Sequence, residues 1–225
     1  MEDLKSSLPW FQPQRKLLQE NFNHHAYIFE GVRGIGKSLF ALDIAKGLLC
    51  ASLPHGAFCN QCRSCHFFDE SNHPDFYFIE PEENKKQISI NQIRNLQEPL
   101  NEYAFLGANK VFFISPAETM TREAFDAVLK NLEEPSNNSF FLLVSHRYQS
   151  LPLTIKSRCA QISLNRPNEE EIKTWLKEKV DNNSEIDLAI QFSKGKPLVA
   201  AEMINSDIKV LRTSFLKEIS DLIKT

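Results

Sequence analysis

Residues 31–38 carry a complete phosphate-binding motif, in the pattern G-x-x-x-x-G-K-[ST]. In such a loop, glycines such as Gly31, Gly34 and Gly36 let the backbone wrap closely around phosphate groups. The ammonium of Lys37 can meet the β-phosphate, and the hydroxyl of Ser38 can coordinate Mg²⁺. We therefore expect these five residues to form a nucleotide-binding shell.

The acid that should accompany this loop is missing. The apolar segment 111–114 ends in Ser115 and Pro116, where a hydrolase of this kind would hold its metal through an acidic residue. Hydrolysis needs that metal and a positioned water. Glu118 lies three positions beyond Ser115 and past the proline, so we do not expect it to replace the acid. The sequence leaves binding of ATP or ADP open, without hydrolysis.

Four cysteines form the second cluster that could do chemistry. Their spacing is C-x8-C-x2-C-x2-C, and they are Cys50, Cys59, Cys62 and Cys65. Four thiolates close a tetrahedral Zn²⁺ site with no open position, which is the structural type of zinc site. The two-residue gaps let neighbouring cysteines turn onto one ion. We expect a structural zinc here.

Three other interpretations of the cysteines remain. Residues 62–66 match the C-x-x-C-H of haem attachment, but that chemistry needs export and leaves Cys50 and Cys59 without a role. A redox pair at Cys59 and Cys62, or four free thiols, would not explain the spacing. Cys159 is most simply a small core residue. The six histidines suggest no second metal site.

Composition narrows the class of protein. The chain has 225 residues, 42% of them hydrophobic and 24% charged, with a net charge of −3. Its Lys and Arg residues are scattered, which argues against strong autonomous binding to nucleic acid but leaves DNA contact within an assembly open. The start lacks the pattern of a secretory signal, and the apolar stretches are too short to span a membrane. We expect a cytoplasmic protein, whose reducing compartment favours metal over disulfides.

Hydrophobic periodicity predicts the elements that position these residues. Short apolar runs predict strands at 26–30, 75–79, 110–114, 140–144 and 159–164. Helical spacing follows the phosphate loop, begins again after Ser89 with Ile93, Leu96 and Leu100, and recurs at 121–133. Such alternation predicts a parallel sheet covered on both faces, an α/β nucleotide-binding domain. Beyond Pro167 only helical periodicity remains, which predicts a small all-helical domain.

A series of motifs carries a resemblance to a known family. It comprises the phosphate-loop helix running into the cysteine cluster and residues 73–75, 88–94, 130–135 and 151–159. In this order they resemble the bacterial clamp-loader family of DNA polymerase III, from about Leu8 to Asn205. The resemblance implies an AAA+ domain over residues 1–166 with a zinc module at 50–65, and a helical lid domain over 167–206. Residues 207–225 would begin a helical collar domain that is otherwise absent.

Departures from the family pattern distinguish its branches. The gamma/tau members hydrolyse ATP and would have Asp-Glu at Ser115-Pro116 and a nucleotide-sensing Arg at Leu198; Ser145 is a milder change at another sensing position. The chain is therefore similar to the delta-prime branch. This implies no ATPase activity on its own and a place in the DNA-directed DNA polymerase III holoenzyme, a nucleotidyltransferase complex. An active gamma/tau-type ATPase and a zinc-stabilised scaffold without nucleotide function are the alternatives.

The resemblance also implies a catalytic role for Arg158 at a neighbouring subunit. In the family, the Arg of residues 157–159 reaches the γ-phosphate of ATP bound next door, as an arginine finger. The alternative is a surface Arg before an edge strand. The implied partners are the gamma/tau and delta clamp-loader subunits and, through the assembly, the sliding clamp and primed DNA.

Overall fold

A computed structural model describes residues 8–53, 56–107, 109–136, 138–179 and 186–205. Contacts between Cα atoms divide these residues into two compact units. The larger unit holds residues 11–32 and 37–165, and the smaller holds residues 8–10, 33–36 and 166–205. The predicted collar segment at 207–225 lies outside the described residues. Within the described ranges, no helix has the length and apolar character needed to span a membrane.

The larger unit contains a five-stranded sheet whose strands all run parallel, in the order β2-β3-β4-β1-β5. The strands are β1 (Ala26–Glu30), β2 (Phe76–Ile79), β3 (Lys110–Ile114), β4 (Ser139–Ser145) and β5 (Ala160–Ser163). β1 lies between β4 and β5, with Ile28 opposite Leu143 on one side and Gln161 on the other. The predicted α/β class and all five predicted strands are confirmed.

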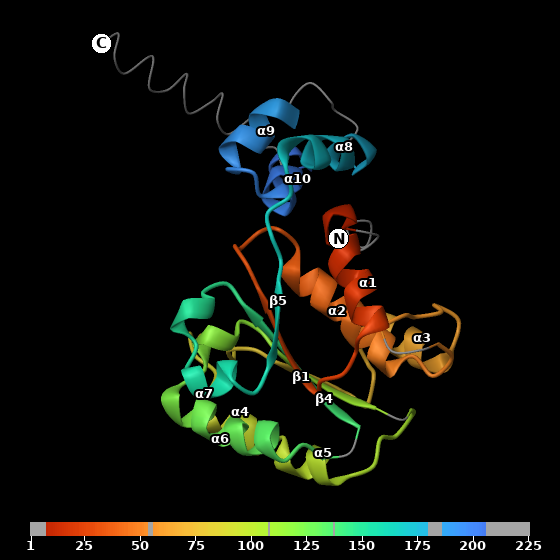
Figure 1. The fold of residues 1–225 in the computed structure, drawn as a ribbon, viewed down its shortest axis with the longest axis vertical. Helices are drawn as coiled ribbons and strands as arrows, with labels where there is room; N and C mark the ends of the chain where they lie inside the picture. The colour runs from red at the N-terminus through yellow and green to blue at the C-terminus, as the bar shows by residue number, and fades with distance from the viewer. Residues whose placement is uncertain (1–7, 54–55, 108, 137, 180–185, 206–225) are drawn as a thin grey trace. The chain divides into compact units, whose positions relative to one another are not determined.

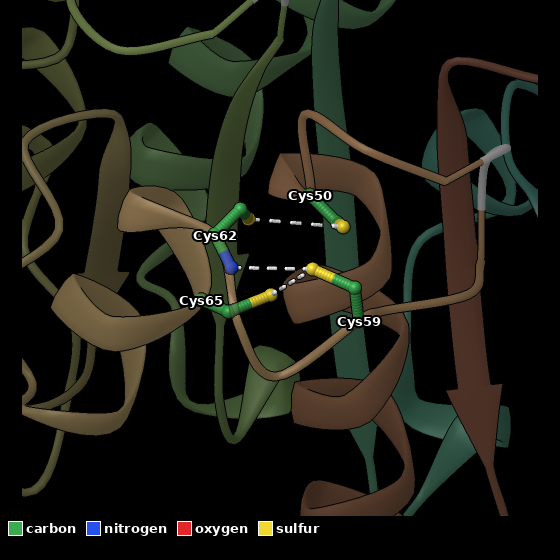
Figure 2. Close-up of side chains that lie close together, drawn as sticks. All are labelled: Cys50, Cys59, Cys62 and Cys65. Carbon is green, nitrogen blue, oxygen red and sulfur yellow. Dashed lines mark hydrogen bonds between the residues drawn. The ribbon is translucent and has the colours of Figure 1, made fainter.

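Helices of the larger unit cover the sheet (Figure 1). They are α1 (Gln12–Glu20), α2 (Lys37–Leu49), α3 (Arg63–Asp69), α4 (Ile90–Arg94), α5 (Gln97–Asn101), α6 (Arg122–Glu133) and α7 (Leu153–Lys156). The short 3-10 turns of this unit are Ala117–Thr119 and Tyr148–Ser150; another, Pro9–Phe11, has its first two residues in the smaller unit. The four cysteines come together where α2 ends and α3 begins (Figure 2).

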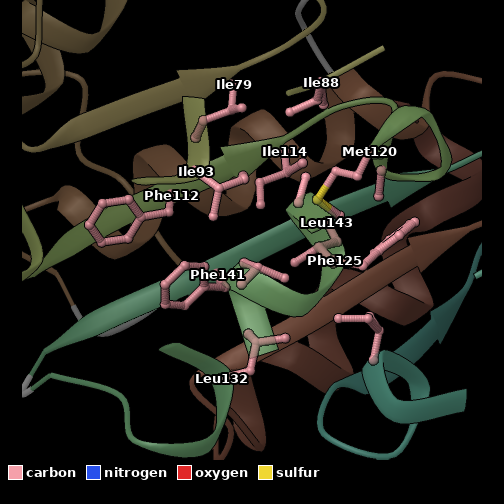
Figure 3. Packing of buried hydrophobic residues seen from close by; sticks show 14 of the residues in the cluster. Ile79, Ile88, Ile93, Phe112, Ile114, Met120, Phe125, Leu132, Phe141 and Leu143 are labelled. Carbon is pink, nitrogen blue, oxygen red and sulfur yellow. The ribbon is translucent and has the colours of Figure 1, made fainter. Parts of the chain in front are cut away.

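Alternate residues of each strand point to opposite faces, as the pleat requires. On one face, side chains from β1, β3 and β4 form a core with α4, α6 and α7 (Figure 3). Phe112 and Phe141 stack there at 5.0 Å between ring centroids. On the other face, Phe29 of β1 meets Phe40 of α2 at 5.9 Å. Because both faces are covered there, β1, β3 and β4 are apolar along most of their length, whereas the edge strand β5 alternates apolar and polar residues.

The helix expected after Ser89 is divided in two. Ser89 and Gln92 form a capping box that begins α4, which ends at Arg94, and α5 begins at Gln97. The physical reason is Pro99, which has no N–H to donate to the carbonyl of Asn95 and whose ring crowds that carbonyl. Ile93, Leu96 and Leu100 nevertheless all reach the core, as their spacing predicts.

The smaller unit contains three helices among its described residues. They are α8 (Glu169–Lys179), α9 (Ile186–Phe192) and α10 (Pro197–Asn205). Trp175 of α8 is 2% exposed and meets Trp10 edge to face, at 5.3 Å between ring centroids. The predicted helical character beyond Pro167 is therefore found in the described part of this region.

Candidate metal centre and phosphate-binding loop

The four cysteines converge from two short segments. Cys50 follows the last residue of α2, and Cys65 is the third residue of α3. Cys59 and Cys62 lie between the two helices, on the segment that we call the metal-binding loop. All four Sγ atoms lie within 4.8 Å of one another. The pairs Cys50–Cys62 and Cys59–Cys65 are each separated by 4.0 Å (Figure 2). The cluster that the spacing predicts is therefore assembled and could hold a metal ion.

These separations can be compared with a tetrahedral site. With metal–sulfur bonds of about 2.3 Å, the sulfur atoms of a tetrahedron lie about 3.8 Å apart. The two 4.0 Å pairs are close to this value, and they exceed the bond length of a disulfide by almost a factor of two. The four thiols therefore fit a four-coordinate metal without large movement of the backbone.

Two backbone N–H groups favour the thiolate form of Cys59, which is the form that binds a cation. The amide N–H groups of Gln61 and Cys62 point at Cys59 Sγ, at 3.5 and 3.3 Å. These hydrogen bonds lower the pKa of the Cys59 thiol to about 6. Burial has the opposite effect on Cys65 and raises the pKa of its thiol to about 12. A bound cation would favour the thiolate at every position, because its charge is the largest in such a site.

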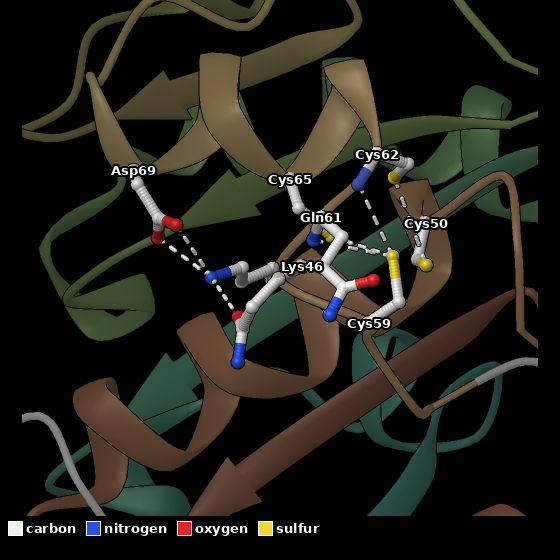
Figure 4. A network of polar contacts seen from close by, with 8 residues as sticks. Lys46, Cys50, Cys59, Gln61, Cys62, Cys65 and Asp69 are labelled. Atoms are coloured by element: carbon white, nitrogen blue, oxygen red, sulfur yellow. Dashed lines mark hydrogen bonds and ion pairs between the residues drawn. The ribbon is translucent and has the colours of Figure 1, made fainter.

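A buried lysine joins the metal-binding loop to the P-loop helix (Figure 4). Lys46 of α2 is 8% exposed, and its Nζ donates to Asn60 Oδ1 at 2.6 Å and to both carboxylate oxygens of Asp69. The same ammonium lies 4.8 Å from the ring centre of Phe58. Sequence reasoning missed this residue, because a lysine inside a helix is ordinarily solvated. Only the folded loop around it shows what it binds.

A second connection runs from α3 to the segment that leads into β2. The hydroxyl of Ser64 donates to the carbonyl of Leu49 at 2.6 Å and lies 2.8 Å from Nε2 of His73. The other ring nitrogen of His73 accepts the amide of Asp75, at 3.1 Å. Nε2 must then carry the proton, so His73 donates to Ser64. Burial lowers the pKa of His73, although the charge of Asp75 opposes this.

The phosphate-binding loop has the backbone that its glycines predict. Gly31, Gly34 and Gly36 all have positive φ angles, of 148°, 91° and 95°. A side chain is disfavoured at the last two, which lie in the region that only glycine adopts readily. Lys37 is 2% exposed, and its Nζ donates to the carbonyl of Val32 at 2.7 Å. The loop leads directly into α2, whose first residue is Lys37.

Within the smaller unit, residues 33–36 of this loop are closely packed. A Cβ on Gly36 would lie 2.5 Å from Leu8 Cδ1. The indole of Trp10 donates to the carbonyl of Ile35 at 3.1 Å, and the amide of Leu198 donates to that of Gly34 at 3.3 Å. These contacts bind two carbonyls of the loop, those of Gly34 and Ile35.

Glu118, the acid after the incomplete strand motif, has a partner within the protein. Both of its carboxylate oxygens accept the amide of His146, at 3.1 and 3.2 Å. His146 follows Ser145, the last residue of β4. The Glu118 carboxylate thus links the ends of β3 and β4. Ser115, where the sequence pattern of an active hydrolase would have an acid, directly follows β3.

Arg158 lies between α7 and β5, at one edge of the sheet. Its Nη2 lies 2.5 Å from Oε1 of Glu133, and its Nη1 donates to the carbonyl of Thr154 at 3.0 Å and to Ser157 Oγ at 3.3 Å. The side chain is 34% exposed. Glu133, the partner of this ion pair, is the last residue of α6, and its side chain is 49% exposed.

Comparison of folds defines the class of protein. A DNA polymerase III gamma subunit-related protein from Thermotoga maritima superimposes with a TM-score of 0.56 over 91% of this chain and 62% of that one, at 22% identity. The RuvB Holliday junction branch migration motor of the same organism gives 0.58 over 92% and 64%, at 12% identity. With the parallel sheet and the P-loop, these likenesses place the chain in the AAA+ fold class.

Comparison of sequences defines the family. The family model described as "DNA polymerase III, delta subunit" matches residues 10–168. DNA polymerase III subunit delta' of Haemophilus influenzae is 34% identical over 93% of this chain, and that of Pseudomonas aeruginosa is 35% identical over 96%. The chain therefore belongs to the DNA polymerase III delta subunit family. It spans 65% and 67% of the length of these two relatives.

A match over a shorter part of the chain belongs to the other branch. DNA polymerase III subunit tau/gamma of Haemophilus influenzae is 35% identical over 71% of this chain, which is 23% of that protein. The predicted kinship with both delta-prime and gamma/tau proteins is confirmed. The matches over most of the chain carry the name delta'.

Proposed function

We propose that this chain is the delta-prime subunit of a DNA polymerase III clamp loader, with gamma/tau and delta subunits as its partners. The assembly would load a sliding clamp on primed DNA in the cytoplasm. The relatives named delta', which match over most of the chain, support this assignment. The proposal includes an AAA+ domain over residues 1–166, a helical lid domain over 167–206 and a collar domain that begins at 207.

We further propose that the P-loop can hold ATP or ADP without hydrolysing it. Two observations support this. The residue that follows β3 is Ser115, which offers no carboxylate for Mg²⁺. Glu118, the next acid along the chain, is already paired with the amide of His146. Gly31, Gly34, Gly36, Lys37 and Ser38 would form the binding shell.

We propose Zn²⁺ as the ion held by the cysteines. A set of four thiolates favours zinc among the common cellular metals of tetrahedral geometry, with iron as the competitor. The site has no position for water, so its role would be structural. The amides of Gln61 and Cys62 support this role, because they orient the Cys59 thiol that would bind the ion.

The catalytic contribution of this chain would be Arg158, acting on ATP held by the adjacent subunit. A fixed guanidinium stabilises the charge that develops on the transferred phosphoryl group, with an effect of ~10³–10⁵ on rate in the GTPases. The single observation that carries this proposal is the position of Arg158. It stands at the edge of the sheet, on a short turn, with a side chain that is held yet partly exposed.

The test is reconstitution with the gamma/tau and delta subunits of the same organism. ATP hydrolysis would be measured for loaders containing the wild-type chain, Arg158→Ala or Lys37→Ala, with assembly checked by gel filtration. We expect Arg158→Ala to assemble normally and to lower ATPase activity at least tenfold, and Lys37→Ala to leave turnover close to wild type. An unchanged rate of ATP hydrolysis with Arg158→Ala would contradict the proposed role of Arg158 as an arginine finger. Hydrolysis by the isolated chain that Lys37→Ala abolishes would instead establish an active ATPase.

A further inference from the structure

Glu133 is the last residue of α6 and the acidic partner of Arg158. It directly follows Leu132, which is 2% exposed in the sheet core. The carboxylate therefore projects from a helix end that is anchored in the interior. Its Oε1 lies 2.5 Å from Nη2 of Arg158, so the guanidinium is tied to α6 as well as to its own turn.

Among the residues that the structure describes, the other hydrogen bonds of the guanidinium go to that turn. Thr154 belongs to α7, and Ser157 directly precedes Arg158. Both accept from Nη1, and neither can orient the side chain relative to anything beyond its own segment. Glu133 is thus the contact that relates the guanidinium to the body of the sheet domain. A guanidinium has five N–H donors, so three such acceptors leave donors for phosphate oxygens.

We propose that Glu133 is a positioning residue for Arg158, which holds the guanidinium in the plane that meets the phosphate of a neighbouring subunit. The proposal rests on the proposed role of Arg158 as an arginine finger. The side chains of Arg158 and Glu133 are 34% and 49% exposed, so the ion pair itself contributes little to stability. Its effect is on orientation, because a group already held in place loses less freedom when it meets the reacting atoms.

Glu134 provides a matched control, because it is the next residue and has the same charge. Among the residues that the structure describes, it forms no ion pair. Glu133→Ala, Glu133→Gln and Glu134→Ala would each be assembled with gamma/tau and delta subunits, after thermal unfolding shows that each variant is folded. The turnover number and the KM for ATP would be measured for every loader.

We expect Glu133→Ala to lower kcat by about three- to thirtyfold with KM unchanged. This range lies between the small effect of an exposed ion pair and the roughly hundredfold effect of misplacing a catalytic group. Glu133→Gln keeps an acceptor oxygen and should fall between Glu133→Ala and wild type. Glu134→Ala should be indistinguishable from wild type.

A double variant separates positioning from other effects. If Glu133 acts through Arg158, then Glu133→Ala should add nothing to the loss caused by Arg158→Ala. An equal loss in both backgrounds, or a Glu133→Ala loader as fast as wild type or faster, would overturn the inference while leaving the finger in place. If Arg158→Ala is itself without effect, the proposed function of Arg158 fails, and the inference fails with it.

Discussion

Lys46 places its ammonium 2.7 and 2.8 Å from the two carboxylate oxygens of Asp69, across the loop that carries the metal-binding cysteines. The lysine belongs to α2, which begins at the phosphate-binding loop, and the aspartate is the last residue of α3. The ion pair thus joins two elements that have different roles in the molecule. Because the side chain of Lys46 is only 9% exposed, the pair is protected from water on one side.

Asp69→Asn should therefore weaken the fold measurably. The change leaves a nearly buried ammonium without its charged partner, and we expect the free energy of unfolding to fall by about 1–2 kcal/mol, less than for a fully buried pair because Asp69 is half exposed. Urea denaturation of the metal-loaded protein would measure this. Glu82→Gln breaks the exposed pair with Lys85 and should cost less than about 0.5 kcal/mol. Equal losses for both variants would contradict the importance of burial.

Gly47→Ala should destabilise the attachment of the metal-binding loop. A Cβ at this position would lie 2.5 Å from the carbonyl carbon and 2.8 Å from the Cα of Gly56, and both are backbone atoms that cannot turn aside. We expect a loss of about 1–3 kcal/mol in unfolding free energy, although alanine is the better helix former. Gly107→Ala is the control, because its nearest neighbour would be the Leu49 carbonyl oxygen at 3.6 Å. Thermal unfolding that ranks Gly107→Ala as the more harmful would be incompatible with this packing.

The purified protein should contain one zinc ion per chain. Elemental analysis of wild type, Cys59→Ser and Cys65→Ser should show the metal in the first and its loss from both variants, because three thiolates no longer close the site. Cys159→Ser should keep the metal, since Cys159 lies outside the cluster and burial raises the pKa of its thiol to about 12. Full metal content in Cys65→Ser would show that the four sulfurs do not act together.

His73 should titrate below its ordinary pKa of about 6.5. Burial favours the neutral ring, and protonation of Nδ1 would set an N–H against the amide of Asp75. Since the folded state binds this proton less readily than the unfolded chain, the stability from His73 is complete above pH 6.5 and is lost as the pH falls through the folded-state pKa. An NMR titration of the His73 ring gives the value directly. A midpoint at or above 6.5 would contradict the buried, neutral ring.

Much of the sheet domain could be predicted from local sequence. Its strands are apolar runs ended by turns or prolines, and the cysteine spacing alone predicts the metal cluster. The split between α4 and α5 follows from Pro99 and was missed because the apolar spacing of Ile93, Leu96 and Leu100 continues across it. The periodic pattern shows which residues face the core, whereas the missing proline N–H decides where the helix ends.

The contacts that hold the candidate sites could not be predicted in the same way. Ser64 and His73 are nine residues apart and in unremarkable surroundings, and Glu133 and Arg158 lie on different elements. Their partners are determined by how the loops fold back on the sheet. Hydrophobic periodicity does not predict such contacts. Lys46 illustrates the same limit, since its charge predicts exposure and the structure buries it.

The capping of α2 at its C-terminal end limits which parts of this protein can be deleted. The last carbonyls of that helix are bound by residues from later in the chain: Asn109 donates to Leu48, and Ser64 to Leu49. Deleting residues 50–65 would therefore remove both the four metal ligands and Ser64, which caps α2. A minimal version of the domain would need a new C-terminal stop for α2, such as a glycine followed by a polar turn.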